Sequence, residues 1–173
     1  ARTFQHIRLF DDQSVLINVA VGLHVRLKSN PWQALLRTPA FRREEADAAQ
    51  AAARYLDFVG LLPRINDEAS SLAYGERRRL EIARALASGP QLLLLDEPAA
   101  GMNPQETVEL MQLIRRVRDA GITVFLIEHD MKLVMEISDH IYVLDHGEEI
   151  AQGSPAEVRD NEKVIHAYLG VPD

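Results

Sequence analysis

Residues 72–86 read LAYGERRRLEIARAL, and this stretch decides the fold together with the apolar run and the two acids downstream of it. Its leucines, alanines and arginines favour a helix that begins near Gly75 and stops at Gly89 and Pro90. A short turn later, the apolar run 92–95 leads directly into Asp96 and Glu97. Ligands bind beyond the carboxyl ends of strands in open α/β sheets, so the two acids follow the strand where such folds place their chemistry.

Two apolar runs indicate a parallel sheet. They cover residues 91–95 and 122–127, and a helix predicted from Pro104 to about Gly121 separates them. Strands that are apolar throughout and joined by a helix are typical of a mostly parallel sheet with helices on both faces. Downstream we expect a helix over 130–137, a strand over 141–144, a turn into an edge strand at 149–151, and short helices over 155–159 and 162–169.

The first part of the chain favours helices and gives no strand signal between residues 6 and 71. Ser14 is placed to cap a helix that continues to about Leu27. An alanine-rich helix is predicted from Arg42 to Val59, with Gly60 as its stop. We therefore predict one partial domain with three parts: a helical insert over 6–71 preceded by Gln5, a core over 72–151, and C-terminal helices over 152–173.

The composition is that of an ordinary globular chain. Of its 173 residues, 47% are hydrophobic and 26% are charged. The net charge of −7 argues against nucleic acid as a partner, because binding to its phosphates requires clustered Lys and Arg. We interpret the densest basic run, Arg77-Arg78-Arg79, as the solvated face of an amphipathic helix. The absence of cysteine excludes disulfides and thiolate metal sites. No apolar run approaches the roughly 20 residues that span a bilayer, so any membrane attachment is expected to come through a partner.

Asp96 and Glu97 are the first candidates for chemistry. A carboxylate at the end of a buried strand can hold Mg²⁺ directly or through water, and the next one can orient a water that attacks a γ-phosphate. Taken alone, the pair is equally consistent with two acids that end a strand at the surface. Gly75 strengthens the functional interpretation, because a helix N-terminus one helix earlier in the chain offers N–H groups to an anion.

Three further residues are candidates by position. His129 follows the second apolar strand, so it would emerge beside Glu97 if the two strands are neighbours, and an imidazole there can hydrogen-bond a γ-phosphate. Gln5 carries an amide able to contact Mg²⁺, water or phosphate, although spacing alone also allows a structural role. Asn103 is a natural N-cap with Pro104 at the first helical position, and capping alone explains it.

Together these residues resemble the motifs of ABC ATPases. Gln5, residues 72–76, residues 92–97, residues 100–103 and His129 are similar in order to the Q-loop, signature, Walker B, D-loop and switch histidine of that family. The similarity extends over the whole chain. It is closest to the ATP-binding subunits of branched-chain amino-acid importers, through the stretches RTFQHIRLF, LRTP, IEHDMKLVM and AYLG.

The resemblance implies a P-loop NTPase-like fold, with ATP and Mg²⁺ as ligands. Asp96 and Gln5 would serve Mg²⁺, Glu97 the attacking water, and His129 the γ-phosphate. Leu72, Ala73, Tyr74, Gly75, Glu76 and Asn103 would contribute to nucleotide binding. It also implies a second ATPase subunit, transmembrane permease subunits, a periplasmic binding protein as an indirect partner, and peripheral attachment to the cytoplasmic face of the membrane.

The chain departs from the family pattern in two respects. The common signature is Leu-Ser-Gly-Gly-Gln, whereas here Ala73 lacks the hydroxyl and Tyr74 replaces a glycine. We hypothesise that the site served by this signature is the weaker of two in a heterodimer. The chain also contains no G-x-x-x-x-G-K-S/T phosphate loop, since its lysines, Lys28, Lys132 and Lys163, do not follow a glycine. We therefore expect these residues alone to be inactive and to form the back two-thirds of an ATPase whose initial strands are absent.

Alternatives remain open at this level. The chain could belong to another ABC system, such as lipopolysaccharide export. A DNA-repair ATPase head pairs a similar helix with two acids, but it would need long coiled-coil heptads that this sequence lacks. A third possibility is a non-catalytic subunit that only docks on a permease or on a partner ATPase.

Overall fold

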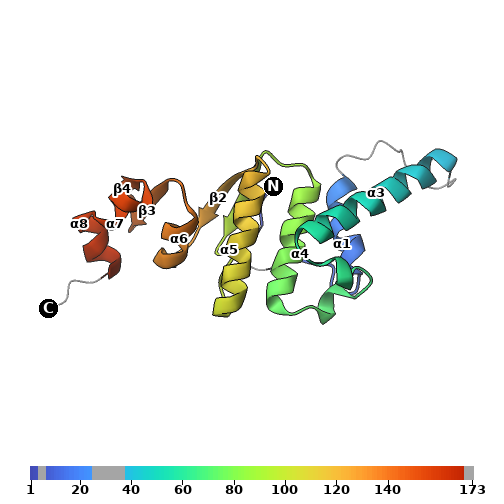
Figure 1. Cartoon of the computed structure of the whole chain (residues 1–173), viewed down its shortest axis with the longest axis horizontal. Coiled ribbons are helices and arrows are strands. Elements are labelled where there is room, and N and C mark those ends of the chain that lie inside the picture. Colours follow the sequence, from blue (N-terminus) through green and yellow to red (C-terminus); the bar gives the residue numbers. More distant parts are fainter. Residues whose placement is uncertain (4–6, 25–37, 170–173) are drawn as a thin grey trace. The chain divides into compact units, whose positions relative to one another are not determined.

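The computed structural model describes residues 1–3, 7–24 and 38–169, which fall into two compact units, Ala1–Ile127 and Glu128–Asp173 (Figure 1). In the first unit the elements are α1 (Val15–Leu23), α3 (Pro39–Phe58), the 3₁₀ turns η2 (Leu62–Arg64) and η3 (Ala69–Ser71), α4 (Tyr74–Ala87), β1 (Leu92–Asp96), α5 (Pro104–Asp119) and β2 (Thr123–Ile127). The predicted division into 6–71, 72–151 and 152–173 stays a prediction.

Side-chain caps begin the helices of the insert. The Ser14 hydroxyl accepts a hydrogen bond from the Ile17 N–H at 3.3 Å, which confirms the predicted start of α1. The helix ends at Leu23, and the expected extension to Leu27 falls on residues outside the described ranges. α3 begins at Pro39, three residues before the predicted Arg42, because proline at the first helical position starts a helix rather than ending a loop.

α1 packs closely against α4, and α3 packs against both helices. Gly22 lies at the tightest point, because a Cβ added there would lie 2.2 Å from the Arg84 carbonyl oxygen and 3.0 Å from the Ala87 Cβ. The helices share a buried core that includes Val15, Val19, Leu56, Leu80 and Ala83. This packing holds α4 rigidly beside the insert.

The sheet of the first unit is parallel, as predicted. β1 pairs with β2 from Leu92 opposite Thr123 to Asp96 opposite Ile127. On the other side of β1, Arg2 forms a parallel bridge with Leu94, and hydrogen bonds of 2.9 Å run from Thr3 N to Leu94 O and from Leu94 N to Ala1 O. β1 is therefore the central strand among the described residues.

The strands are buried on one face only, which corrects the expectation of cover on both. Leu93 and Leu95 are 1% exposed, whereas Leu92 is 43% exposed. Phe125 and Ile127 of β2 are each 50% exposed. The physical reason is that successive strand residues point to opposite faces, and within the first unit α5 packs against β2 and against α4.

The basic run in α4 is not a solvated face, so that interpretation was wrong. Arg78 is fully buried, and its Nη1 donates to the Glu81 carboxylate at 2.8 Å in an ion pair inside the core. Arg77 pairs with Asp11 at 2.5 Å, and its side chain is 23% exposed. The run turns inward because a carboxylate three residues along the helix can neutralise a buried guanidinium.

The second unit is a small α+β assembly. α6 (Met131–Ile137) leads to an antiparallel hairpin of β3 (Ile141–Asp145) and β4 (Glu148–Gly153), followed by α7 (Pro155–Arg159), α8 (Glu162–Val164) and a π-helical turn, η4 (Ile165–Leu169). The hairpin turns at His146 and Gly147, which both have positive φ angles, so the predicted turn is confirmed. The core of the second unit consists of Ile141, Val143, Val158 and Val164.

Candidate functional site

Two acidic side chains follow the buried part of β1, as the sequence predicted. Asp96 is the last residue of the strand and stands opposite Ile127 in parallel register. Its carboxylate accepts a hydrogen bond from Arg2 Nη2 at 3.2 Å, and 28% of the side chain is exposed. Arg2 therefore offsets the negative charge of Asp96. No sequence pattern indicated this pairing, because the two residues lie 94 positions apart.

Glu97 occupies an uncommon backbone conformation. Its φ angle is +41°, in the left-handed region that costs a non-glycine residue about 1–3 kcal/mol. The Glu97 N–H donates to the Ile127 carbonyl at 2.9 Å, so pairing with β2 continues one residue beyond the strand before the chain turns. The turn is thereby fixed to the sheet, and strained acids of this kind are concentrated at functional sites.

The signature stretch forms the start of α4. Ala73 is the N-cap residue, with φ −63° and ψ 160°, and Tyr74 to Glu76 form the first turn. The Glu76 carboxylate accepts a hydrogen bond from the Ala73 N–H at 2.9 Å, but the alanine methyl cannot accept one in return. The N–H groups of the first helical turn have no carbonyl partner within a helix, so they can bind an anion. Leu72 precedes them and is buried in the core, at 6% exposure.

Gly75 lies against the first turn of α5. A Cβ added to it would lie 2.8 Å from Glu106 Oε1 and 3.0 Å from Glu106 Cδ. Glu106 is itself held in place, because its carboxylate accepts from the Asn103 N–H at 3.0 Å while Asn103 Oδ1 accepts from the Glu106 N–H at 3.0 Å. The predicted capping role of Asn103 is confirmed. The Asn-x-x-Glu spacing is the sequence signal that would have found Glu106.

Tyr74 provides a second link between the same two segments. A Cβ on Gly101, whose φ angle is +77°, would lie 3.7 Å from Tyr74 Cε1, so the tyrosine ring lies over the loop that precedes α5. The ring remains 42% exposed. The residues that resemble the signature and the D-loop thus lie near one another within one unit.

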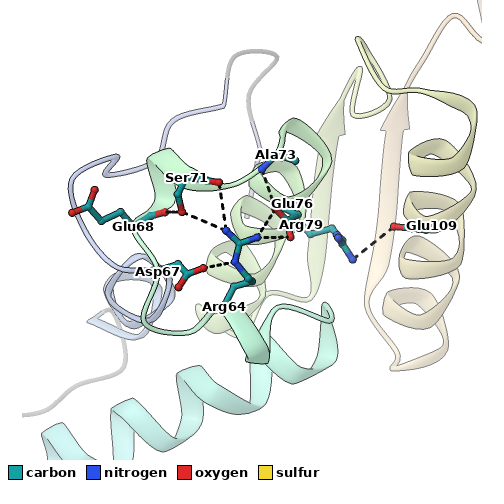
Figure 2. A network of polar contacts seen from close by, with 8 residues as sticks. All are labelled: Arg64, Asp67, Glu68, Ser71, Ala73, Glu76, Arg79 and Glu109. Carbon is teal, nitrogen blue, oxygen red and sulfur yellow. Dashed lines mark hydrogen bonds and ion pairs between the residues drawn. The ribbon is translucent and has the colours of Figure 1, made fainter.

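Arg64 connects the insert to the start of α4 (Figure 2). Its Nη1 lies 3.3 Å from both carboxylate oxygens of Glu76, and its Nε donates to Asp67. Nη2 donates to the carbonyl and to the hydroxyl of Ser71 at 3.4 Å each. The hydrogen bond to Asp67 raises the pKa of the Arg64 guanidinium, and the Glu76 charge acts in the same direction. Sequence reasoning missed this residue, because its partner Glu76 lies 12 positions away across an irregular turn.

The remaining predicted residues lie elsewhere. Gln5 is outside the described residues. His129 belongs to the second unit, and its side chain is 74% exposed with Nδ1 4.0 Å from Glu128 Oε2. The strands β1 and β2 are neighbours, as the hypothesis about His129 required. The functional roles of all these residues stay predictions.

The donors at the end of β1 suit a magnesium ion. Asp96 offers a partly exposed carboxylate, and Mg²⁺ is held in proteins by one or two carboxylates together with water and substrate phosphates. Among the described residues no three His, Cys, Asp or Glu side chains gather into a metal site. An ion here would therefore depend on the phosphates of a nucleotide for most of its ligands.

Comparison with known proteins decides the family. Residues 1–100 match the family model described as "ABC transporter". This chain belongs to the ABC transporter family. Residues 148–173 also match a model described as "Branched-chain amino acid ATP-binding cassette transporter". Both the predicted family and the predicted fold class are confirmed.

Relatives in the ABC transporter family cover most of the chain. It is 54% identical over 170 residues to the high-affinity branched-chain amino acid transport ATP-binding protein LivG of Salmonella typhimurium, over 98% of this chain and 67% of LivG. It is 41% identical over 100 residues to the lipopolysaccharide export ATP-binding protein LptB of Escherichia coli, over 58% of this chain and 42% of LptB. The crystal structure of MJ1267, an ATP-binding cassette of an ABC transporter in its ADP conformation, superposes with a TM-score of 0.79 at 29% identity, over 99% of this chain and 68% of MJ1267.

Proposed function

We propose that this chain belongs to an ATP-binding subunit whose ATP hydrolysis drives the import of branched-chain amino acids through a membrane permease. The observation that carries the proposal is the 54% identity to LivG over 98% of the chain. The match of residues 148–173 to the branched-chain amino acid model supports the same substrate class over lipopolysaccharide, because the similarity to LptB covers only 58% of the chain.

The hydrolytic step is assigned to the end of β1. Glu97 accepts a proton from water as the water oxygen attacks the γ-phosphorus, the bond between that phosphorus and the bridging oxygen breaks, and ADP and inorganic phosphate are the products. Asp96 would hold a magnesium ion, which would supply positive charge to offset that of the phosphate oxygens. His129 donates a hydrogen bond to the γ-phosphate, and Gln5 links the nucleotide to the permease. The fixed backbone of Glu97 supports this assignment, since it limits where the carboxylate can move.

The start of α4 is assigned to a neighbouring ATP. Two cassettes enclose two nucleotides, and the N–H groups of residues 74–76 in one face the γ-phosphate bound to the other. The partners are a second ABC ATPase subunit, permease subunits and, indirectly, a periplasmic binding protein. None of the helices within residues 1–3, 7–24 and 38–169 combines the length and apolarity of a membrane span. We place the subunit at the cytoplasmic face of the membrane, attached through the permease.

The test replaces Glu97 by glutamine in the complete subunit, assembled with its partner cassette and permease in liposomes. Hydrolysis should fall about 10²- to 10⁴-fold while ATP binding persists, as expected when a general base is lost. Glu149→Gln, an exposed position on β4, is the matched control and should hydrolyse normally. An unchanged rate in Glu97→Gln would remove Glu97 from this role. Uptake of radiolabelled leucine in the wild type tests the transported class, and ATP hydrolysis without leucine uptake would point to another ABC system.

A further inference from the structure

The start of α4 carries a negative charge where the proposed function requires an anion to bind. Glu76 is the third residue of the helix, and its carboxylate is 21% exposed. The common signature has a neutral glutamine at this position. A carboxylate beside a γ-phosphate repels it, and the repulsion weakens only if an opposite charge lies within a few ångströms.

Arg64 supplies that opposite charge. Its Nη1 is 3.3 Å from both Glu76 oxygens, so this one nitrogen contacts both ends of the carboxylate (Figure 2). The same carboxylate accepts from the Ala73 N–H at 2.9 Å. Glu76 is therefore held from two sides, by the backbone before the helix and by a charged group from η2.

Arg64 is itself fixed by the turn that carries it. Asp67 binds Nε, and the Ser71 carbonyl and hydroxyl bind Nη2 at 3.4 Å. The Ser71 hydroxyl donates to the Glu68 carbonyl at 2.8 Å, which links the last residue of η3 to the residue that precedes this turn. A guanidinium held by a carboxylate, a carbonyl and a hydroxyl cannot swing away without breaking several contacts at once.

We propose that Arg64 is a positioning residue of the ATP site: it neutralises Glu76 and holds its carboxylate on the Ala73 N–H, which leaves the N–H groups of residues 74–76 open to a γ-phosphate. In this chain the ion pair takes the place of the neutral glutamine. The proposal rests on the proposed function, since it assumes that the start of α4 faces a phosphate.

A contribution to stability alone would not explain this arrangement. The Arg64 side chain is 35% exposed, and exposed ion pairs add little to the free energy of unfolding because water screens them. The contacts of Arg64 instead fix the orientation of the Glu76 carboxylate at the start of α4. The predicted effect of losing Arg64 is therefore larger on nucleotide turnover than on folding.

The test uses the complete subunit with its partner cassette and permease. In Arg64→Gln, kcat/KM for ATP should fall about tenfold, the size of one charge-assisted contact, with little change in the midpoint of thermal unfolding. The double variant Arg64→Gln/Glu76→Gln should recover most of that loss, because a neutral glutamine needs no counter-charge. Arg79→Gln is the matched control. It also removes one guanidinium charge, but Arg79 lies one turn after Glu76 on α4 and pairs with Glu109 at 3.8 Å (Figure 2). Hydrolysis at the wild-type level in Arg64→Gln, or no recovery in the double variant, would overturn the proposal.

A second measurement does not depend on hydrolysis. Amide hydrogen exchange at Ala73 in the nucleotide-free subunit should accelerate in Arg64→Gln, because Glu76 loses the group that holds it on that N–H. Unchanged exchange would overturn the positioning role even if the wild type proved inactive. An inactive wild type with accelerated exchange would instead refute the proposed function, and would show only that Arg64 holds Glu76 on the Ala73 N–H.

Discussion

Replacing Ala73 by serine should both stabilise α4 and strengthen the ATP site. Ala73 already has the extended backbone of an N-cap residue, with φ −63° and ψ 160°, so serine fits without rearrangement. Half of a capping box is in place, because the Glu76 carboxylate accepts from the Ala73 N–H at 2.9 Å. The serine oxygen would accept from the Glu76 N–H and complete the box.

Two of the described helices, α5 and α7, begin with complete boxes that set the expected geometry. In α5, Asn103 and Glu106 exchange hydrogen bonds of 3.0 Å each. In α7, Ser154 and Glu157 exchange bonds of 2.8 Å and 3.4 Å. A serine N-cap is worth about 1 kcal/mol relative to alanine, within a range of roughly 0.5–2 kcal/mol. For a domain of this size that corresponds to a rise in Tm of about 2–4 °C.

The assay is thermal unfolding of the complete subunit, followed by circular dichroism. Ala46→Ser is the matched control, because Ala46 lies exposed in the interior of α3, where serine should lower stability by a few tenths of a kcal/mol. The same chemical change is therefore expected to have opposite signs at the two positions. A Tm that does not rise in Ala73→Ser would refute the account of how α4 begins.

The same variant tests the hypothesis of a weak ATP site. A hydroxyl can accept from the Glu76 N–H and still donate its proton to a γ-phosphate. Restoring that donor should strengthen transition-state binding by roughly 1.5–3 kcal/mol, so hydrolysis by the assembled transporter should rise. A higher Tm with an unchanged rate would mean that Ala73 caps the helix poorly but does not limit catalysis.

Two glycine substitutions should separate folding from function. In Gly22→Ala the new Cβ would lie 2.2 Å from the Arg84 carbonyl oxygen, so we expect the free energy of unfolding to fall by about 1–3 kcal/mol. The fall should be measured as a lower denaturation midpoint at constant m-value. An unchanged midpoint would contradict the packing described for α1 and α4. In Gly75→Ala the new Cβ would clash with Glu106 and disturb the cap that Glu106 forms with Asn103 at the start of α5. The loss of that cap, about 1 kcal/mol, is offset by a similar gain in helix propensity, so Tm should change little while hydrolysis falls more than about tenfold. A normal rate would show that the contact does not position the start of α4.

Much of the fold could be predicted because local patterns agreed with the tertiary structure. The apolar run before Asp96 formed β1, and capping residues such as Ser14 and Asn103 began helices at the expected positions. The main error concerned Arg78, since amphipathic patterning assumes that charges face water. Such patterning cannot reveal that Glu81, on the same helix, would neutralise the Arg78 guanidinium in the core.

The candidate site could be predicted only where a motif fixes the position along the chain. Asp96 and Glu97 could be predicted because the apolar run that forms β1 stops at these two charged residues. Arg2 and Arg64 were not found, because each reaches its carboxylate partner through the folded arrangement of separate segments. Gly75 was identified from its place at the start of a helix, whereas its closeness to Glu106 depends on how closely α4 and α5 approach.

The left-handed backbone at Glu97 has a consequence for engineering this protein. Selection for thermostability would favour glycine at this position, because glycine adopts a positive φ angle without the cost of roughly 1–2 kcal/mol that a side chain incurs. The same substitution would delete the proposed base. Position 97 should therefore be held fixed in any consensus or computational stabilisation of this subunit, since a gain in melting temperature there would be accompanied by the loss of turnover.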